Sequence, residues 1–175
     1  DGDFARIEFR DFDYDAIRRA FAAFGFDLNP DALALAVFDH GAAPPDVSDR
    51  QFRMDYLVER LHRDRRLSTF AFHAADVPPI MTRLAALAAT ANAQADAPVI
   101  VMDTAPAAVL GALDDPVVAA HRSALVANVG NFHTLAFRLG LDEIEGVFEH
   151  HTGLLDLPRL EALLRALADG SLKHD

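Results

Sequence analysis

Three strand-like segments follow one another in the last third of the chain, and they constrain the fold more than any other feature. Residues 123–129 are apolar on both faces, whereas residues 133–139 and 143–150 alternate between two kinds of side chain. Alternation with a period of two is typical of a half-buried strand, and an apolar run indicates a central strand. Asn131 and Phe132 leave room only for a tight link, so the first two strands are predicted to be antiparallel. This region is therefore predicted to form a sheet.

Strands and helices alternate before these three segments. The patterns predict strands at residues 4–10, 33–38, 68–73 and 99–102, and helices at residues 14–24, 52–61, 78–92, 106–113 and 157–167. In the helical segments, apolar residues recur three or four positions apart. The succession predicts an α/β fold with a mixed sheet and flanking helices. We expect an N-terminal α/β part at residues 1–95 and a C-terminal strand-strand-strand-helix part at residues 96–175, arranged as two lobes or as one compact domain.

Charge and composition exclude several classes of protein. The 27 acidic and 16 basic residues give a formal net charge of −11, which argues against binding to nucleic acid or to an anionic membrane. The chain has no cysteine, so it cannot supply a thiolate zinc site, a cysteine nucleophile or an iron–sulfur cluster. It contains no apolar run of about 20 residues and no signal-peptide core, so we expect a cytoplasmic location. Because the chain begins at Asp1 rather than at methionine, we expect a fragment of a longer or processed protein.

Polar residues gather where the predicted strands end. They are Asp39 and His40, Asp103, Asn128 with Gly130 and Asn131, and His150 with His151. Ligands of α/β sheets bind beyond the carboxyl ends of strands, where small residues let backbone amides approach an anion. Asp39 and Asp103 are candidate catalytic residues that would hold Mg²⁺ through water or orient an attacking water. The alternative is that these residues only end the strands, because Asp, Asn and Gly are common there.

Histidine is the residue type that could hold a transition metal in this chain. The candidates are His40, His150 and His151, but the sequence has neither a His-Glu-x-x-His nor a His-x-His motif. His150 and His151 are adjacent on a predicted strand, so their side chains would point to opposite faces. They could share one metal only at a break in the strand. The metal therefore remains unknown, and a packed or solvated pair is the simpler interpretation.

Three sequence blocks carry a resemblance to a known family. They are residues 38–53 (FDHGAAPPDVSDRQFR), 128–137 (NVGNFHTLAF) and 146–153 (GVFEHHTG). Together they resemble the family labelled "putative pyruvate formate-lyase activating enzyme", a domain of unknown function grouped with the actin-like ATPase superfamily of sugar kinases, heat-shock proteins and actin. The resemblance implies a ribonuclease H-like, actin-like ATPase type of sheet. We reject the activity in the label, because a radical activating enzyme needs cysteines that hold an iron–sulfur cluster.

The same resemblance implies which residues bind a ligand. A strand–turn–strand loop cradles nucleotide phosphates in that superfamily, and residues 128–134 would form this loop here. Asn128, Gly130, Asn131 and Thr134 would then bind the cofactor, and His133 joins Asp39 and Asp103 among the candidate catalytic residues. The superfamily usually has an aspartate where Asn128 stands, and the missing charge weakens Mg²⁺ binding.

Three functions of different classes remain open at this stage. The first is a phosphate- or nucleotide-binding protein, with ATP–Mg²⁺ or phosphate as the cofactor or ligand. The second is a metal-dependent hydrolase of a small metabolite, in which His40, His133, His150 and His151 converge with Asp39 or Asp103. The third is a non-catalytic oligomerisation module, because a hydrophobic content of 51% allows a buried homodimer interface.

Overall fold

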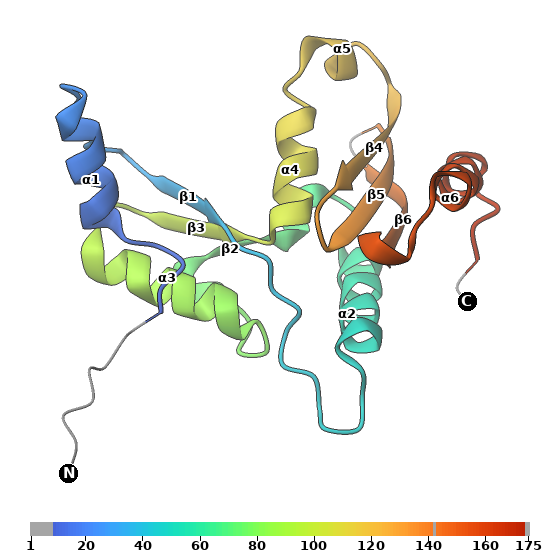
Figure 1. The fold of residues 1–175 in the computed structure, drawn as a ribbon, viewed down its shortest axis with the longest axis horizontal. Helices are drawn as coiled ribbons and strands as arrows, with labels where there is room; N and C mark the ends of the chain where they lie inside the picture. The colour runs from blue at the N-terminus through green and yellow to red at the C-terminus, as the bar shows by residue number, and fades with distance from the viewer. Residues whose placement is uncertain (1–8, 142, 174–175) are drawn as a thin grey trace.

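Two small three-stranded sheets form the framework of the chain (Figure 1). The computed structural model describes residues 9–141 and 143–173. In the first sheet, β3 (Val99–Met102) lies between β1 (Leu33–Ala36), to which it is parallel, and β2 (Ala71–His73), to which it is antiparallel. The second sheet is an antiparallel meander of β4 (Ser123–Val129), β5 (His133–Gly140) and β6 (Glu143–His151). The predicted α/β class with a mixed sheet is confirmed, as is the antiparallel pairing of β4 with β5.

In the described residues, six α-helices flank these sheets. They are α1 (Tyr14–Ala23), α2 (Asp49–Arg63), α3 (Thr82–Gln94), α4 (Thr104–Ala112), α5 (Pro116–Ala119) and α6 (Leu157–Asp169). Most begin where a local Asp or Ser side chain accepts a hydrogen bond from a backbone amide of the first turn, as Ser48 does for α2. In α3 the preceding residue, Met81, makes no such bond. Asp39 replaces it from a distant part of the chain, because its Oδ2 accepts a hydrogen bond from Leu84 N at 2.8 Å.

The apolar core fills both faces of the second sheet. Leu135 and Phe137 of β5 pack with Leu57 of α2 and Val109 of α4 on one face. On the opposite face Ala136 and Phe148 pack against α6, which lies along the outer side of the sheet in Figure 1. A separate core lies between the first sheet and α3. The helices α2 and α4 therefore occupy the space between the two sheets, next to the ends of β1 and β3.

Several local predictions differ from the structure. Residues 123–129 form the edge strand β4 rather than a central strand, and β5 is the central one. The run contains apolar residues on both faces, but strand order depends on which segments pair, and the short turns place β5 between its two chain neighbours. The strand predicted at residues 68–73 is shorter, because residues 67–70 form a 3₁₀ turn. The strand predicted at residues 4–10 lies mostly outside the described residues, and Phe9 and Arg10 are not in a strand.

The division of the chain between residues 95 and 96 stays a prediction. β3, the central strand of the first sheet, begins only a few residues after it and pairs with strands that precede it. No helix in the described part of the chain has the length and apolarity that a membrane span requires.

Candidate functional site

A cavity of about 480 Å³ opens where the two sheets approach each other. The parallel strands β1 and β3 end at the same edge of the first sheet, and the turn between β4 and β5 faces that edge from the second sheet. The lining side chains are Phe38, His40, Arg53, Arg83, Thr104, Ala105, Asn128, Gly130, Phe132, His133, Leu135, Glu149 and His151. The cavity therefore lies beyond the carboxyl ends of parallel strands, where α/β proteins commonly bind ligands.

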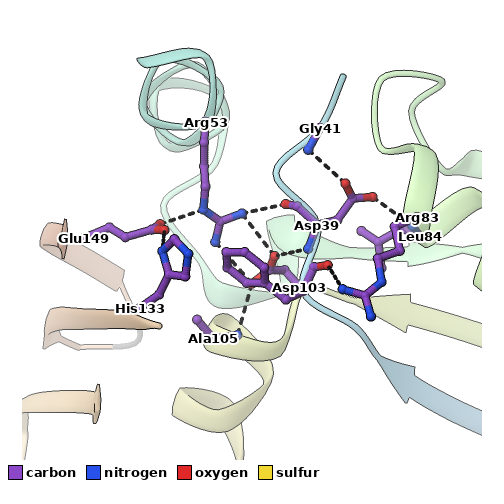
Figure 2. A network of polar contacts seen from close by, with 10 residues as sticks. Asp39, Gly41, Arg53, Arg83, Leu84, Asp103, Ala105, His133 and Glu149 are labelled. Atoms are coloured by element: carbon purple, nitrogen blue, oxygen red, sulfur yellow. Dashed lines mark hydrogen bonds and ion pairs between the residues drawn. The ribbon is translucent and has the colours of Figure 1, made fainter. Parts of the chain in front are cut away.

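Arg53 of α2 connects the two sheets beside this cavity. Its Nε donates to Glu149 Oε2 at 2.6 Å on β6, and its Nη1 donates to Asp103 Oδ2 at 3.1 Å after β3. Nη1 also donates to the carbonyl oxygen of Asp39 at 2.7 Å, after β1. Figure 2 shows the guanidinium between these groups. Arg53 is 4% exposed, so water does not compete for the hydrogen bonds of its guanidinium.

Two carboxylates offset the charge of the buried Arg53. Burial alone would lower the pKa of Arg53, but the carboxylates of Asp103 and Glu149 outweigh it and raise the pKa. The guanidinium also lies over the ring of Phe38, with 4.7 Å from its carbon to the ring centroid. Cation–π and paired-carboxylate contacts of this kind favour arginine over lysine, because the planar guanidinium makes several of them at once.

Asp39 and Asp103 stand beside the cavity but do not line it. Both are buried, at 4% and 8% exposed. The two carboxylate oxygens of Asp39 accept hydrogen bonds from Gly41 N and Leu84 N, each at 2.8 Å. Asp103 accepts from Ala105 N at 3.0 Å, at the start of α4, and from Asp39 N at 3.2 Å. Through these bonds both carboxylates stabilise the backbone that follows β1 and β3. Their predicted catalytic role stays a prediction.

His133 at the start of β5 is the predicted catalytic residue that lines the cavity. Its Nδ1 lies 3.0 Å from Glu149 Oε1, so Glu149 is shared between His133 and Arg53. Burial lowers the pKa of His133, and nearby His40 and Arg53 lower it further, while Glu149 acts in the opposite direction. The rings of His40 and His151 lie 5.2 Å and 5.7 Å from that of His133, between centroids.

The residues predicted to bind the cofactor divide between the cavity wall and its support. Asn128 and Gly130 line the cavity. Thr134 is fully buried, and its Oγ1 lies 3.0 Å from Thr152 Oγ1. The hydroxyl of Thr152 donates to the carbonyl oxygen of Gly130 at 2.7 Å, so this pair supports the turn from behind. Asn131 is exposed and does not line the cavity.

The three candidate metal ligands also separate. His40 and His151 line the cavity, whereas His150 is buried, with its Nδ1 3.1 Å from the carbonyl oxygen of His151. The alternation of a strand explains this, because neighbouring residues of β6 face opposite sides of the sheet. Within residues 9–141 and 143–173, no group of three or more His, Asp or Glu side chains is placed to hold a metal ion.

The sequence patterns assign no role to Arg53 or Arg83, and they place Glu149 only beside the candidate metal ligands His150 and His151. Arg53 lies one helical turn before Leu57, and both residues are buried, so a charged residue on an apolar helix face was the available signal. Glu149 shares its strand face with His151, which also lines the cavity. No pattern singled out Arg83, because its partner Asp11 is 72 positions away in the sequence.

Positive and hydrogen-bonding side chains dominate the wall of the cavity. It contains two arginines and three histidines but only one acid, Glu149, in a chain whose net charge is −11. Arg83 is half-exposed, and its Nη1 donates to the carbonyl oxygen of Phe38 at 3.1 Å. The first residues of α4, Thr104 and Ala105, also line the cavity, and the Asp103 carboxylate caps this end of the helix. The wall therefore offers hydrogen-bond donors to a ligand, and its two arginines are already paired with Asp103, Glu149 and Asp11.

Residues 1–175 match the family described as "Putative pyruvate format-lyase activating enzyme (DUF1786)". No curated protein and no solved structure matches the chain.

Proposed function

The chain belongs to this DUF1786 family, and we propose that it binds a phosphate-bearing small molecule, nucleotides included, in the cavity between its two sheets. The activity in the family's description does not fit these residues, since they contain no cysteine to hold an iron–sulfur cluster. The cavity takes residues from both sheets, and Arg53 connects the two sheets beside it.

The composition of the cavity wall is the observation that carries this proposal. Arginine and histidine side chains recognise phosphate oxygens through charge-assisted hydrogen bonds. Here they gather in one cavity of a strongly acidic chain, together with the start of α4 and the turn between β4 and β5. An added Cβ at Gly130 would lie 3.0 Å from the carbonyl oxygen of His133, so the tight turn favours glycine at this position. A backbone without side chain lets a ligand approach closely.

The position of that turn also supports placing the chain in the actin-like ATPase superfamily, as part of the same proposal. The resemblance implies residues 128–134 as a phosphate-binding loop, and Asn128, Gly130 and His133 from this loop line the cavity. The donors in the wall fit the phosphates of ATP better than they fit its Mg²⁺. The carboxylates of Asp39 and Asp103 already accept backbone hydrogen bonds and lie outside the cavity wall.

Isothermal titration calorimetry with orthophosphate, pyrophosphate, ADP–Mg²⁺ and ATP–Mg²⁺ tests the proposal. We expect at least one of them to bind, and Arg83→Gln to weaken that binding. A hydrogen bond to a charged group contributes about 1.5–3 kcal/mol, so the dissociation constant should rise about 10- to 100-fold. Arg83 is suited to this test because it is half-exposed, so its loss disturbs the core less than loss of Arg53.

Arg165→Gln is the matched control, because Arg165 is exposed on α6, where its guanidinium pairs with Glu161 outside the cavity. It should leave the affinity unchanged. Absence of heat with all four compounds would contradict the proposal, as would equal affinity in wild type and Arg83→Gln.

A further inference from the structure

Glu149 determines which nitrogen of His133 is available to a ligand. The carboxylate is 7% exposed and lies 3.0 Å from Nδ1 of His133, so Nδ1 carries a proton and Nε2 is left for the cavity. The second carboxylate oxygen is held by Arg53 Nε at 2.6 Å. The His133 ring is therefore oriented by a buried carboxylate that is itself fixed. Figure 2 shows this order of contacts, from Arg53 through Glu149 to His133.

The arginines of the cavity are already paired with carboxylates. Arg53 is balanced by Asp103 and Glu149, and Arg83 is paired with Asp11, with 2.6 Å between Nη2 and Oδ1. A ligand with two negative charges would therefore meet little positive charge that is free. The histidines are the groups in the wall that can gain a charge near neutral pH.

Among those histidines, His133 has a buried carboxylate in contact with its ring. An imidazolium at this position would be stabilised by Glu149. Within the described residues, neither His40 nor His151 has such a contact with a carboxylate. The charged and titratable groups around the ring are Glu149 and His151 on β6, His40 after β1, and Arg53 on α2. Burial keeps the pKa of His133 below its ordinary value in the free protein, so the ring is neutral at pH 7 and above. A bound dianion would stabilise the imidazolium and so raise the pKa of His133.

We propose that the cavity takes the doubly charged phosphate group of a small phosphate monoester, and that His133 takes up one proton on Nε2 as the ligand binds. The proton comes from the solvent, and no covalent bond of the ligand changes. This inference rests on the proposed phosphate binding and narrows it to a ligand class. Phosphate diesters carry a single charge, so they would not induce the proton uptake and would bind more weakly.

Calorimetry with glycerol phosphate measures the proton directly. At about pH 7.5 a phosphate monoester is almost fully dianionic, because its second pKa is about 6. Titrations in two buffers with different ionisation enthalpies should show uptake of about one proton for each ligand bound. His133→Gln should reduce the uptake to near zero and leave only the pH dependence that comes from the second pKa of the ligand. Glu149→Gln should also reduce the uptake, because it removes the charge that stabilises the imidazolium.

Two controls separate this result from general effects. His121→Gln changes an exposed histidine outside the cavity, and it should keep the full uptake. Dimethyl phosphate, a diester, should bind to wild type at least about 10-fold more weakly. Nuclear magnetic resonance titration of the wild-type histidines, with and without glycerol phosphate, gives the same answer without a variant. The pKa of His133 should rise above the working pH when the ligand is present.

The possible failures can be told apart. Binding of glycerol phosphate without proton uptake, or with equal uptake in His133→Gln, would overturn this inference and leave phosphate binding intact. Binding of pyrophosphate but not of glycerol phosphate would overturn the ligand class. If no phosphate compound binds, the proposed function fails and this inference fails with it.

Discussion

Replacing Arg53 by Met removes the cation that joins three separate chain segments. Arg53 contacts the ends of β1 and β3 through Asp39 and Asp103, and it contacts β6 through Glu149. Methionine keeps most of the aliphatic volume of the side chain but makes none of these hydrogen bonds. Asp103 would keep its backbone donors, Ala105 N and Asp39 N, whereas Glu149 would lose its ion pair and keep its contact with His133.

The expected loss of stability follows from the two carboxylates that remain buried. Breaking a buried ion pair from one side costs about 3–5 kcal/mol, because it leaves an uncompensated charge in the interior. For a chain of 175 residues, 1 kcal/mol shifts the melting temperature by about 2–4 °C, so we expect a decrease of about 6–20 °C. Arg53→Lys keeps the charge but not the planar fork, and should lie between wild type and Arg53→Met.

Urea unfolding followed by circular dichroism measures this effect as a change in midpoint at constant slope. Arg165→Met is the matched control, because its pair with Glu161 on α6 is exposed and spaced four residues apart. It should cost no more than about 0.5 kcal/mol. The double variant Arg53→Met with Glu149→Met should recover part of the loss, since it removes the isolated carboxylate together with the cation.

The reasoning would be refuted by an Arg53→Met protein that loses less than about 1 kcal/mol. A double variant that simply adds the two single losses would refute it as well, because coupled residues of one network are not additive. Either result would mean that apolar packing alone holds the two sheets in place.

Three further predictions concern pH, backbone conformation and packing. Burial lowers the pKa of His133 in the folded protein below the ordinary 6.5, so as the pH decreases the unfolded chain takes up this proton before the folded one, and the stability of the wild type should fall as pH decreases through about 6.5. In His133→Gln the urea midpoint should fall less over the same pH range, and an equal fall in both proteins would contradict the lowered pKa of His133. Gly41→Ala should lose about 1–3 kcal/mol, because φ is +79° and the new Cβ would lie 2.7 Å from a side-chain carbon of α2; Gly25→Ala, with a similar φ but open space, should lose less in the same assay. Leu167→Ala should lose about 2–5 kcal/mol in thermal unfolding, since Leu167 is 3% exposed on α6 and packs with Ala136 and Phe148 of the second sheet. The same change at the exposed Leu157 should stay within about 0.5 kcal/mol, and similar losses would contradict this packing.

Local sequence patterns predicted most of the secondary structure but not the order of the strands. Helical spacing predicted α1 and α6 almost to their ends, and the β-branched run of residues 99–102 is β3. Periodicity cannot show that β4 is an edge strand, because apolar side chains on both faces are compatible with either place in a sheet. The sequence also did not predict α5, since Pro116 ends one helix pattern and begins another.

The candidate site was predicted in part, through residues that lie at strand ends. The strand-end rule and the resemblance led to Asn128, Gly130 and His133, all of which line the cavity. The same rule led to Asp39 and Asp103, and the structure gives them backbone partners outside the cavity wall. A strand end can hold a ligand or brace a turn with the same residue types, and only the position of its hydrogen-bond donors distinguishes the two.

The sequence by itself predicted the α/β class and the antiparallel β4–β5 pair, because both depend on residues that are neighbours in the chain. Its composition, which includes no cysteine, excluded an iron–sulfur cluster held by cysteines. The tertiary structure alone brought Arg53 and Glu149 together across 96 sequence positions. Pairing over such a distance leaves no periodic trace in the sequence, since it depends on how two sheets and a helix pack. That packing decides which charged side chains surround the cavity.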